Sequence, residues 1–284
     1  MTPIFDGHVH LIGEDADDYL AALLGAMDRN GIGCAVVFGV QDDPECPDSL
    51  ALSAHSRWPD RFVPFTCEVN PQAPDAAEQL DRRLSSGHWM GVGEIYVATD
   101  QATTAHRTRE GEEREYQYPV PSGWAEGPIL SEVLEVCADH RAPALVHCDD
   151  EEVMKEVLSR HPRVTLIWAH ADWFTSSARL LLAEHSNLLL EVGAHLHFGA
   201  LHNPDKPVQH APHMADWFAG CIPLLEDFAG RITYGSDHFE WRHLEPEGNA
   251  DCAYSAVRQA SRRLSPQAER AWRWDTLSTV VKGH

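Results

Sequence analysis

The chain has 284 residues, of which 43% are hydrophobic and 23% charged, and its net charge is −22 at neutral pH. A chain of this length can bury one large core, and it contains no apolar run long enough to span a bilayer. Because nucleic acids and anionic membrane surfaces bind basic patches, the acidic balance argues against both as partners.

The seven cysteines are irregularly spaced and include no Cys-x-x-Cys pair, which is typical of reduced thiols rather than of disulfides or a zinc ribbon. No basic segment followed by an apolar one precedes the first predicted strand, as a secretory signal would require. We therefore expect a cytoplasmic protein that acts on a small molecule. The oligomeric state is left open between a monomer and a homo-oligomer.

Short apolar runs alternate with helical patterns along the chain. Strands are expected near 3–9, 34–39, 62–67, 90–95, 143–147, 164–170, 187–192 and 231–237. Helices are expected near 15–29, 47–57, 74–86, 127–141, 150–160, 174–185, 214–228, 250–263 and 266–281.

These strands are too apolar to have one face exposed to solvent, which indicates a parallel sheet covered by helices. Eight β/α units predict a closed (β/α)8 TIM barrel, and we expect residues 1–284 to form a single domain. The alternative is an open doubly wound sheet. No glycine-rich phosphate loop follows the first strand, as that alternative would favour.

Side chains that bind metal ions stand at the ends of five predicted strands. They are His8, His10, Glu94, His147, His170 and Asp237. Since side chains alternate along a strand, the two histidines of the first strand point the same way. Barrel enzymes carry their catalytic residues at this end of the strands. The pattern predicts a divalent-metal site, with zinc expected and manganese as the alternative.

The chemistry of such a site follows from these residue types. A bound divalent ion lowers the pKa of its water to near neutral and polarises a carbonyl or phosphoryl oxygen. Asp237 would take the proton of the water as general base and then give it to the leaving group as general acid. We therefore expect a metal-dependent hydrolase that cleaves an amide, lactone or ester-like bond in a small molecule.

Two connections, near 97–126 and 194–213, are long for a barrel and would lie on its catalytic face. Substrate-binding candidates follow the fourth, sixth, seventh and eighth strands. They are Tyr96, Trp173, His195, His238 and Trp241. The two tryptophans have an alternative role as caps of the barrel mouth. By alternation along its strand, Glu191 would point into the barrel and contact a ligand histidine.

The motifs together resemble the amidohydrolase superfamily. They are Asp-Gly-His-Val-His at 6–10, Gly-Val-Gly-Glu-Ile at 91–95 and Tyr-Gly-Ser-Asp at 234–237. They look like its amidohydrolase-related branch, called amidohydrolase 2, and the second motif is also similar to TatD-type metal hydrolases. The resemblance runs from residue 6 to beyond residue 237. It implies a metal-dependent enzyme on a (β/α)8 barrel.

For a site with two ions, the resemblance implies a division of the ligands. His8 and His10 would bind the more buried ion, and His147 and His170 the second. Glu94 would bridge the two ions, where many relatives use a carboxylated lysine.

Asp237 would contact the first ion and the attacking water. In a site with one ion, His8, His10, His147 and Asp237 would suffice, and His170 would contact the substrate. The residues that follow Asp237 differ from the Trp-Pro common in that branch, so the pocket floor is expected to be particular to this chain.

Other functions remain open at this point. The superfamily branch includes decarboxylases and hydratases, so a lyase acting on a small carboxylic acid is the main alternative. A TatD-like phosphoesterase fits Glu94 but not the acidic net charge. A barrel that has lost catalysis and serves as a scaffold would lack a ligand, whereas all six ligand positions are filled.

Overall fold

The structure is a computed structural model, and it describes most of the chain. The described residues are 2–13, 15–40, 46–70, 73–98, 103–107, 113–117, 127–171, 175–193, 221–237, 241, 244–246 and 249–282.

Eight strands of the structure correspond to the eight predicted ones. They are β1 (Ile4–His10), β2 (Ile32–Phe38), β3 (Phe62–Pro64), β4 (Val92–Ala98), β7 (Ala144–Cys148), β8 (Leu166–Trp168), β9 (Leu188–Val192) and β10 (Ile232–Tyr234). The helices between them also follow the prediction. They are α1 (Ala16–Asn30), α2 (Ser49–Arg57), α3 (Ala76–Ser85), α4 (Pro128–Asp139), α5 (Glu151–Arg160), α6 (Thr175–Glu184) and α9 (Asn249–Ser261). Of the helix expected near 214–228, the described part is helical from 221 to 227.

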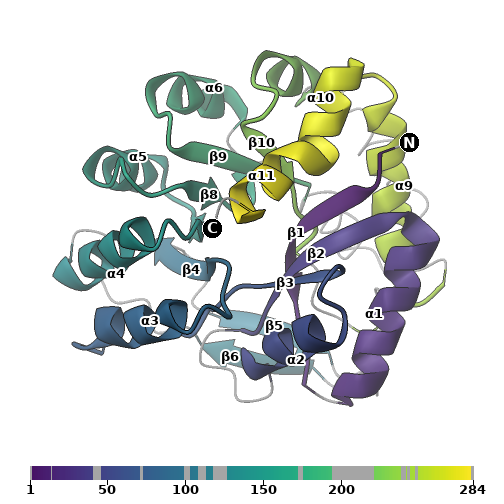
Figure 1. Ribbon diagram of the computed structural model, residues 1–284. Helices are drawn as coiled ribbons and strands as arrows, with labels where there is room; N and C mark the ends of the chain where they lie inside the picture. The colour runs from purple at the N-terminus through teal and green to yellow at the C-terminus, as the bar shows by residue number, and fades with distance from the viewer. Residues whose placement is uncertain are drawn as a thin grey trace.

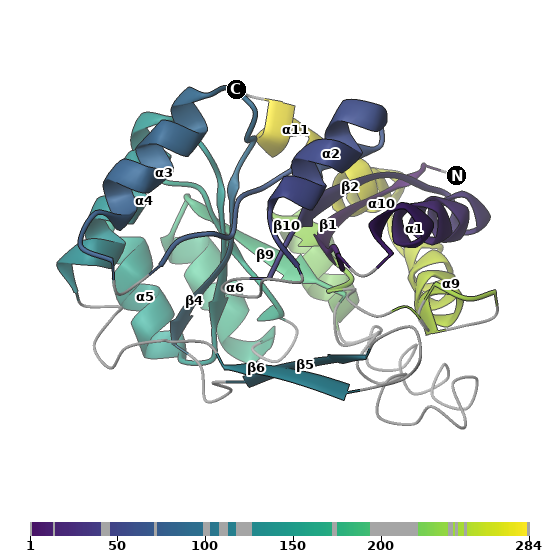
Figure 2. The same ribbon diagram turned by 90° about the horizontal axis from the view of Figure 1, so that it is seen from below.

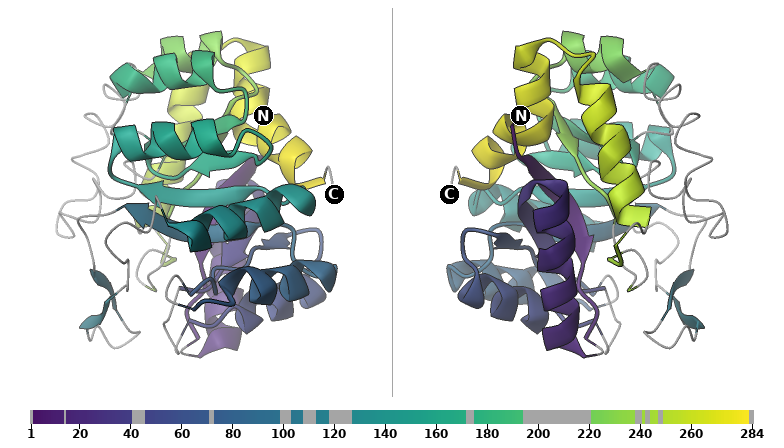
Figure 3. Two further views of the ribbon diagram at one scale, coloured as in Figure 1. Left: turned by 90° about the vertical axis from the view of Figure 1, so that its left-hand side faces the viewer. Right: turned by 90° about the vertical axis from the view of Figure 1, so that its right-hand side faces the viewer.

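Parallel pairing runs β1-β2-β3 and β4-β7-β8-β9-β10. A bridge between Thr66 and Val92 joins the end of β3 to β4. The circle is completed where Ser236, just after β10, donates from its backbone N–H to Asp6 of β1 at 2.9 Å. The helices lie outside these strands (Figures 1 and 3), so the fold is the expected (β/α)8 barrel.

The barrel interior is a separate hydrophobic cluster. On β2, Val36 and Phe38 belong to this inner cluster, whereas Ala35 and Val37 pack in the larger cluster that includes the helices. This is the alternation expected of a strand with one face toward the barrel axis and one toward the helices.

The C-terminal segment closes one end of the barrel. It consists of α10 (Pro266–Arg270), a π-helical turn (Ala271–Asp275) and α11 (Thr276–Lys282), where the sequence predicted one helix. Leu277 and Val281 of α11 belong to the inner cluster, and the Trp274 ring lies 5.3 Å from that of Phe5. A Cβ on Gly33 would come within 2.7 Å of the Trp274 ring, so this close approach requires glycine.

The connection predicted near 97–126 contains an antiparallel hairpin, β5 (Thr103–Arg107) and β6 (Glu113–Gln117). The hairpin lies on the opposite side of the barrel from α11 (Figure 2). The C-terminal ends of the barrel strands point to the side of the hairpin. The connection expected near 194–213 lies outside the described residues. Within the described part of the chain, no helix is long and apolar enough to cross a membrane.

We predict that Leu277→Ala lowers the free energy of unfolding by about 2–5 kcal/mol, because it empties part of the sealed interior. Leu277 is 2% exposed. The control is Leu180→Ala on α6, where the side chain is 64% exposed and the change should stay within about 0.5 kcal/mol. Urea unfolding followed by circular dichroism measures both. Equal, small effects would show that α11 does not seal the barrel.

Candidate metal centre

All six predicted ligand residues lie together at the ends of the barrel strands. β1 carries the first two, β4 and β7 one each, and two follow β8 and β10. Those last two, His170 and Asp237, have φ angles of 55° and 52°. Left-handed backbone is uncommon for residues other than glycine and tends to occur at functional sites. Here it turns each side chain into the barrel mouth just after its strand ends.

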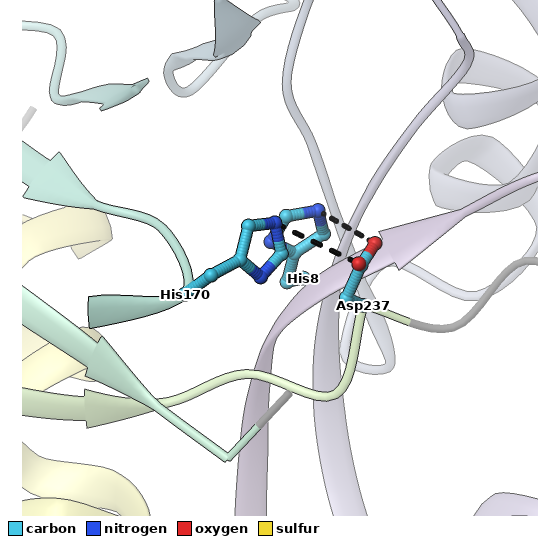
Figure 4. Close-up of side chains that lie close together, drawn as sticks. All are labelled: His8, His170 and Asp237. Carbon is cyan, nitrogen blue, oxygen red and sulfur yellow. Dashed lines mark ion pairs between the residues drawn. The ribbon is translucent and has the colours of Figure 1, made fainter. Parts of the chain in front are cut away.

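The first group of ligand atoms is formed around the two histidines of β1. The Nε2 atoms of His8 and His10 lie 3.2 Å apart. Asp237 Oδ1 lies 3.2 Å from the first of these atoms and 3.3 Å from the second. Glu94 Oε2 lies 3.7 Å from both. Figure 4 shows the carboxylate of Asp237 facing the ring of His8.

The other nitrogen of each imidazole ring is already engaged. Nδ1 of His10 lies 2.8 Å from the carbonyl oxygen of Gly39, and Nδ1 of His8 lies 3.1 Å from Glu191. Because a carbonyl oxygen only accepts, Nδ1 of His10 carries the proton and Nε2 of the neutral ring presents a lone pair. With both rings neutral, these two nitrogens and two carboxylate oxygens match the donor set of a divalent cation.

A second group uses the other oxygen of Glu94. Oε1 lies 3.1 Å from Nδ1 of His147 and 3.1 Å from Nε2 of His170. Asp237 Oδ2 lies 3.6 Å from the same Nε2 of His170. Behind His147, Asp149 Oδ1 lies 3.2 Å from Nε2. Glu94 and Asp237 therefore each face both groups, one oxygen to each side.

The charges of the site reinforce one another. Burial alone raises the pKa of Glu94 and of Asp237, because it disfavours a charged carboxylate. The field of His8 opposes this effect at both residues, assisted at Glu94 by His147 and at Asp237 by His170, so both pKa values fall well below the usual range. Both side chains are thus held as carboxylates, the form that binds metal ions.

The histidines show the reverse pattern. Burial lowers the pKa of His8, but Glu191, Asp237 and Glu94 raise it well above its ordinary value. Burial likewise lowers the pKa of His147, and its two carboxylate partners raise it to about 10. The carboxylates therefore favour a positive charge between the histidine rings. Protons on the rings or a bound cation can supply that charge.

Asp6 fixes the geometry of the first group from behind. It is fully buried and accepts hydrogen bonds from the backbone N–H groups of His8 and Ser236 and from Tyr254 Oη, at 3.2, 2.9 and 2.7 Å. Burial raises the pKa of Asp6 to about 6 against the effect of these donors. Asp6 opens the Asp-Gly-His-Val-His motif, but the motif alone does not indicate this supporting role.

Asp48 is a second buried carboxylate that the sequence analysis missed. It accepts from Thr66 Oγ1 at 2.6 Å, from the N–H of Cys67 at 3.0 Å and from the N–H of Gly39 at 3.3 Å. Since the carbonyl of Gly39 accepts from His10, Asp48 supports that histidine through the backbone. No motif in the sequence marks it, because its partners are mostly backbone groups of distant strands.

Of the predicted substrate-binding residues, Tyr96 lies at the site, with its ring 5.0 Å from that of His147. Trp241 packs edge-on against Tyr19 at 5.3 Å, and Tyr19 Oη donates to the carbonyl oxygen of His10 at 3.1 Å. This contact links Trp241 to α1, and both of its expected roles, substrate binding and capping of the barrel mouth, stay predictions. The other three candidates lie outside the described residues: Trp173, His195 and His238.

Comparison with solved structures finds the same fold in several enzymes. A probable 2-pyrone-4,6-dicarboxylic acid hydrolase from Acinetobacter baumannii is 12% identical with a TM-score of 0.60, and the match covers 99% of each chain. A 4-oxalomesaconate hydratase from Rhodopseudomonas palustris is 14% identical with a TM-score of 0.56, covering 98% of this chain and 95% of the other.

A dihydroxybenzoic acid decarboxylase from Polaromonas sp., with bound manganese and an inhibitor, is 13% identical with a TM-score of 0.57, covering 99% of this chain and 97% of the other. At these identities the likeness shows the fold alone. No curated protein matches the sequence significantly.

A family model identifies the family of this chain, which structures of such low sequence identity cannot do. The amidohydrolase model matches residues 5–276, which include all six ligand positions. The likeness of segment 91–95 to TatD-type hydrolases gains no support from these matches. Since the match spans nearly the whole sequence, this chain belongs to the amidohydrolase family of enzymes.

Proposed function

We propose that this protein is a metal-dependent hydrolase with two divalent ions at the barrel mouth. The observation that carries the proposal is the position of Glu94. Its Oε2 faces His8 and His10, and its Oε1 faces His147 and His170. A carboxylate so divided between two pairs of histidines is suited to bridge two ions, as the family resemblance implies for this strand end.

The balance of charge also supports two ions. The carboxylates of Glu94, Glu191 and Asp237 are buried together, and neutral histidines do not offset their three negative charges. One divalent ion would leave the site negative. Two would leave a positive balance, which favours negative charge developing on a substrate oxygen.

The identity of the ion is a narrower proposal. We propose zinc, with manganese as the alternative, because imidazole and carboxylate ligands suit both. The similar decarboxylase from Polaromonas sp. holds manganese, which keeps the alternative open.

The proposed reaction is hydrolysis of an amide, lactone or ester-like bond in a small molecule. When bound, the ions would lower the pKa of water to near neutral and polarise the carbonyl oxygen of the substrate. Asp237, 7% exposed and held as a carboxylate, would accept the proton of that water and return it to the leaving group. Tyr96 would line the pocket beside His147.

The second candidate function is decarboxylation or hydration of a small carboxylic acid. The observation in its favour is the likeness in fold to a decarboxylase and a hydratase, as well as to a hydrolase. We prefer hydrolysis because of the divided carboxylate of Glu94. A small molecule as substrate and a cytoplasmic location also remain proposals, and they rest on the acidic net charge and the cysteine pattern.

The first test is metal content, measured by mass spectrometry on untagged protein. We expect about two equivalents per chain in the wild type, because two ligand groups share Glu94. His8→Ala and Glu94→Ala should both lose metal, since each removes a ligand, whereas His88→Ala, at an exposed position, should not. One equivalent that is insensitive to Glu94→Ala would contradict the two-ion site and make decarboxylation the leading candidate.

The second test addresses the proton transfer. Asp237→Asn keeps the shape of the side chain but removes its basicity, so we expect kcat to fall by about 10²- to 10⁴-fold. The substrate is first identified from a panel of lactones, N-acyl amides, aryl esters and hydroxybenzoates, the last followed by release of carbon dioxide. Asp60→Asn, at an exposed position, is the control. Full activity of Asp237→Asn would show that another group moves the proton.

A further inference from the structure

We propose that Glu191 is a positioning residue that orients His8 toward the metal ion and strengthens the binding of that ion. The inference rests on the proposed function, because it assumes a cation at Nε2 of His8. It adds a residue of β9 to a site whose ligands come from other strands.

The contact between the two side chains is close and completely buried. Glu191 and His8 are both 0% exposed, and the two carboxylate oxygens lie 3.1 and 3.2 Å from Nδ1 of His8. Within the described part of the chain, the carboxylate of Glu191 has Nδ1 of His8 as its hydrogen-bond partner. A buried carboxylate is unfavourable unless a positive charge is near, and no arginine or lysine of the described residues forms an ion pair with Glu191.

Positive charge can reach Glu191 through the ring of His8, either as a proton on that ring or as a cation bound at Nε2. A carboxylate that accepts the proton of Nδ1 fixes the tautomer, so that Nε2 presents its lone pair to the site. It also makes that nitrogen a stronger electron donor. A cation at Nε2 therefore stabilises the buried charge of Glu191, and the charge in turn strengthens the bond to the cation.

The other histidine of β1 provides an internal comparison. Nδ1 of His10 donates to the carbonyl oxygen of Gly39, which carries no net charge. The two ligand histidines are thus oriented by similar hydrogen bonds, but only His8 has a charged acceptor. Removing the charge of Glu191 should weaken the bond between His8 and the metal ion and leave the bond of His10 unchanged.

The carboxylate of Glu191 occupies the space beside Gly235 that a side chain at that position would fill. A Cβ on Gly235 would lie 2.2 Å from Cδ, 2.4 Å from Oε2 and 2.6 Å from Cγ of Glu191. Gly235 stands two residues before Asp237, on the segment that delivers that ligand. Gly235→Ala would therefore force Glu191 away from His8, although alanine fits the local backbone.

The experiment measures the affinity of the protein for zinc, and separately for manganese, by competition with a chromophoric chelator. Glu191→Gln should bind about tenfold more weakly and Glu191→Ala about a hundredfold, since the first keeps a neutral acceptor and the second keeps none. Thr233→Val is the matched control. Thr233 pairs with Glu191 across the sheet, and within the described part of the chain its hydroxyl donates to the carbonyl oxygen of Leu190.

A thermal melt of metal-free protein separates positioning from a structural role. Glu191→Gln keeps the volume of the side chain and an acceptor for the Nδ1 proton of His8, so the metal-free protein should stay folded, and the loss of metal affinity should persist well below its melting temperature. A fall in melting temperature with unchanged metal affinity would assign Glu191 a structural role and overturn the inference.

A double-mutant cycle tests the steric argument. Gly235→Ala should weaken metal binding at least tenfold in the wild type, but should have little further effect in Glu191→Ala, where the space is empty. Equal effects in both backgrounds would contradict displacement of Glu191. Wild-type protein that binds neither metal would overturn the proposed function itself, whereas tight wild-type binding that Glu191→Gln does not weaken would overturn only this inference.

Discussion

The hydrogen bonds that Asp6 accepts hold the first and last strands of the barrel together at the level of the site. One links it to the backbone of His8 and another to that of Ser236, and Ser236 Oγ donates back to the carbonyl oxygen of His8 at 3.1 Å. The register of β1 against β2 shifts between Asp6 and Val9. Ligands separated by more than two hundred residues thereby come within 3.2 Å of each other. The geometry of the first ligand group depends on this closure.

The site concentrates negative charge at buried positions. Glu94, Glu191 and Asp237 are all buried. Without a cation, the repulsion among these carboxylates destabilises the folded chain. With a cation bound, the same carboxylates contribute to the free energy of metal binding. For the proposed metal site, metal affinity and folding stability would therefore be linked, and the ions would contribute to the stability of the strand ends that bind them.

The sequence allowed the barrel and the clustering of six candidate metal-binding side chains to be predicted, because both depend on local patterns. Eight apolar runs alternate with helices, and His8, Glu94 and Asp237 each stand where such a run ends. The partners of those ligands were harder to predict. Asp48 acts on backbone groups that only the tertiary fold brings near, and the expected contact of Glu191 became a specific one, with His8, only in the structure.

Two elements differed from prediction for physical reasons. The hairpin of β5 and β6 lies in a polar segment without the apolar alternation that marks a half-buried strand. The helix expected near 266–281 contains a π-helical turn, within which Trp272 packs on Tyr234 and Trp274 on Phe5. Helical periodicity does not distinguish such a turn from a regular helix.

The seal formed by α11 also sets an order of events during synthesis. Phe5 and Leu277 meet in the barrel interior although they lie near opposite ends of the sequence. A chain emerging from the ribosome can form its early β/α units, but their inner faces stay open until the last helix arrives. Until α11 has been synthesised, the apolar interior is exposed to solvent and to other chains.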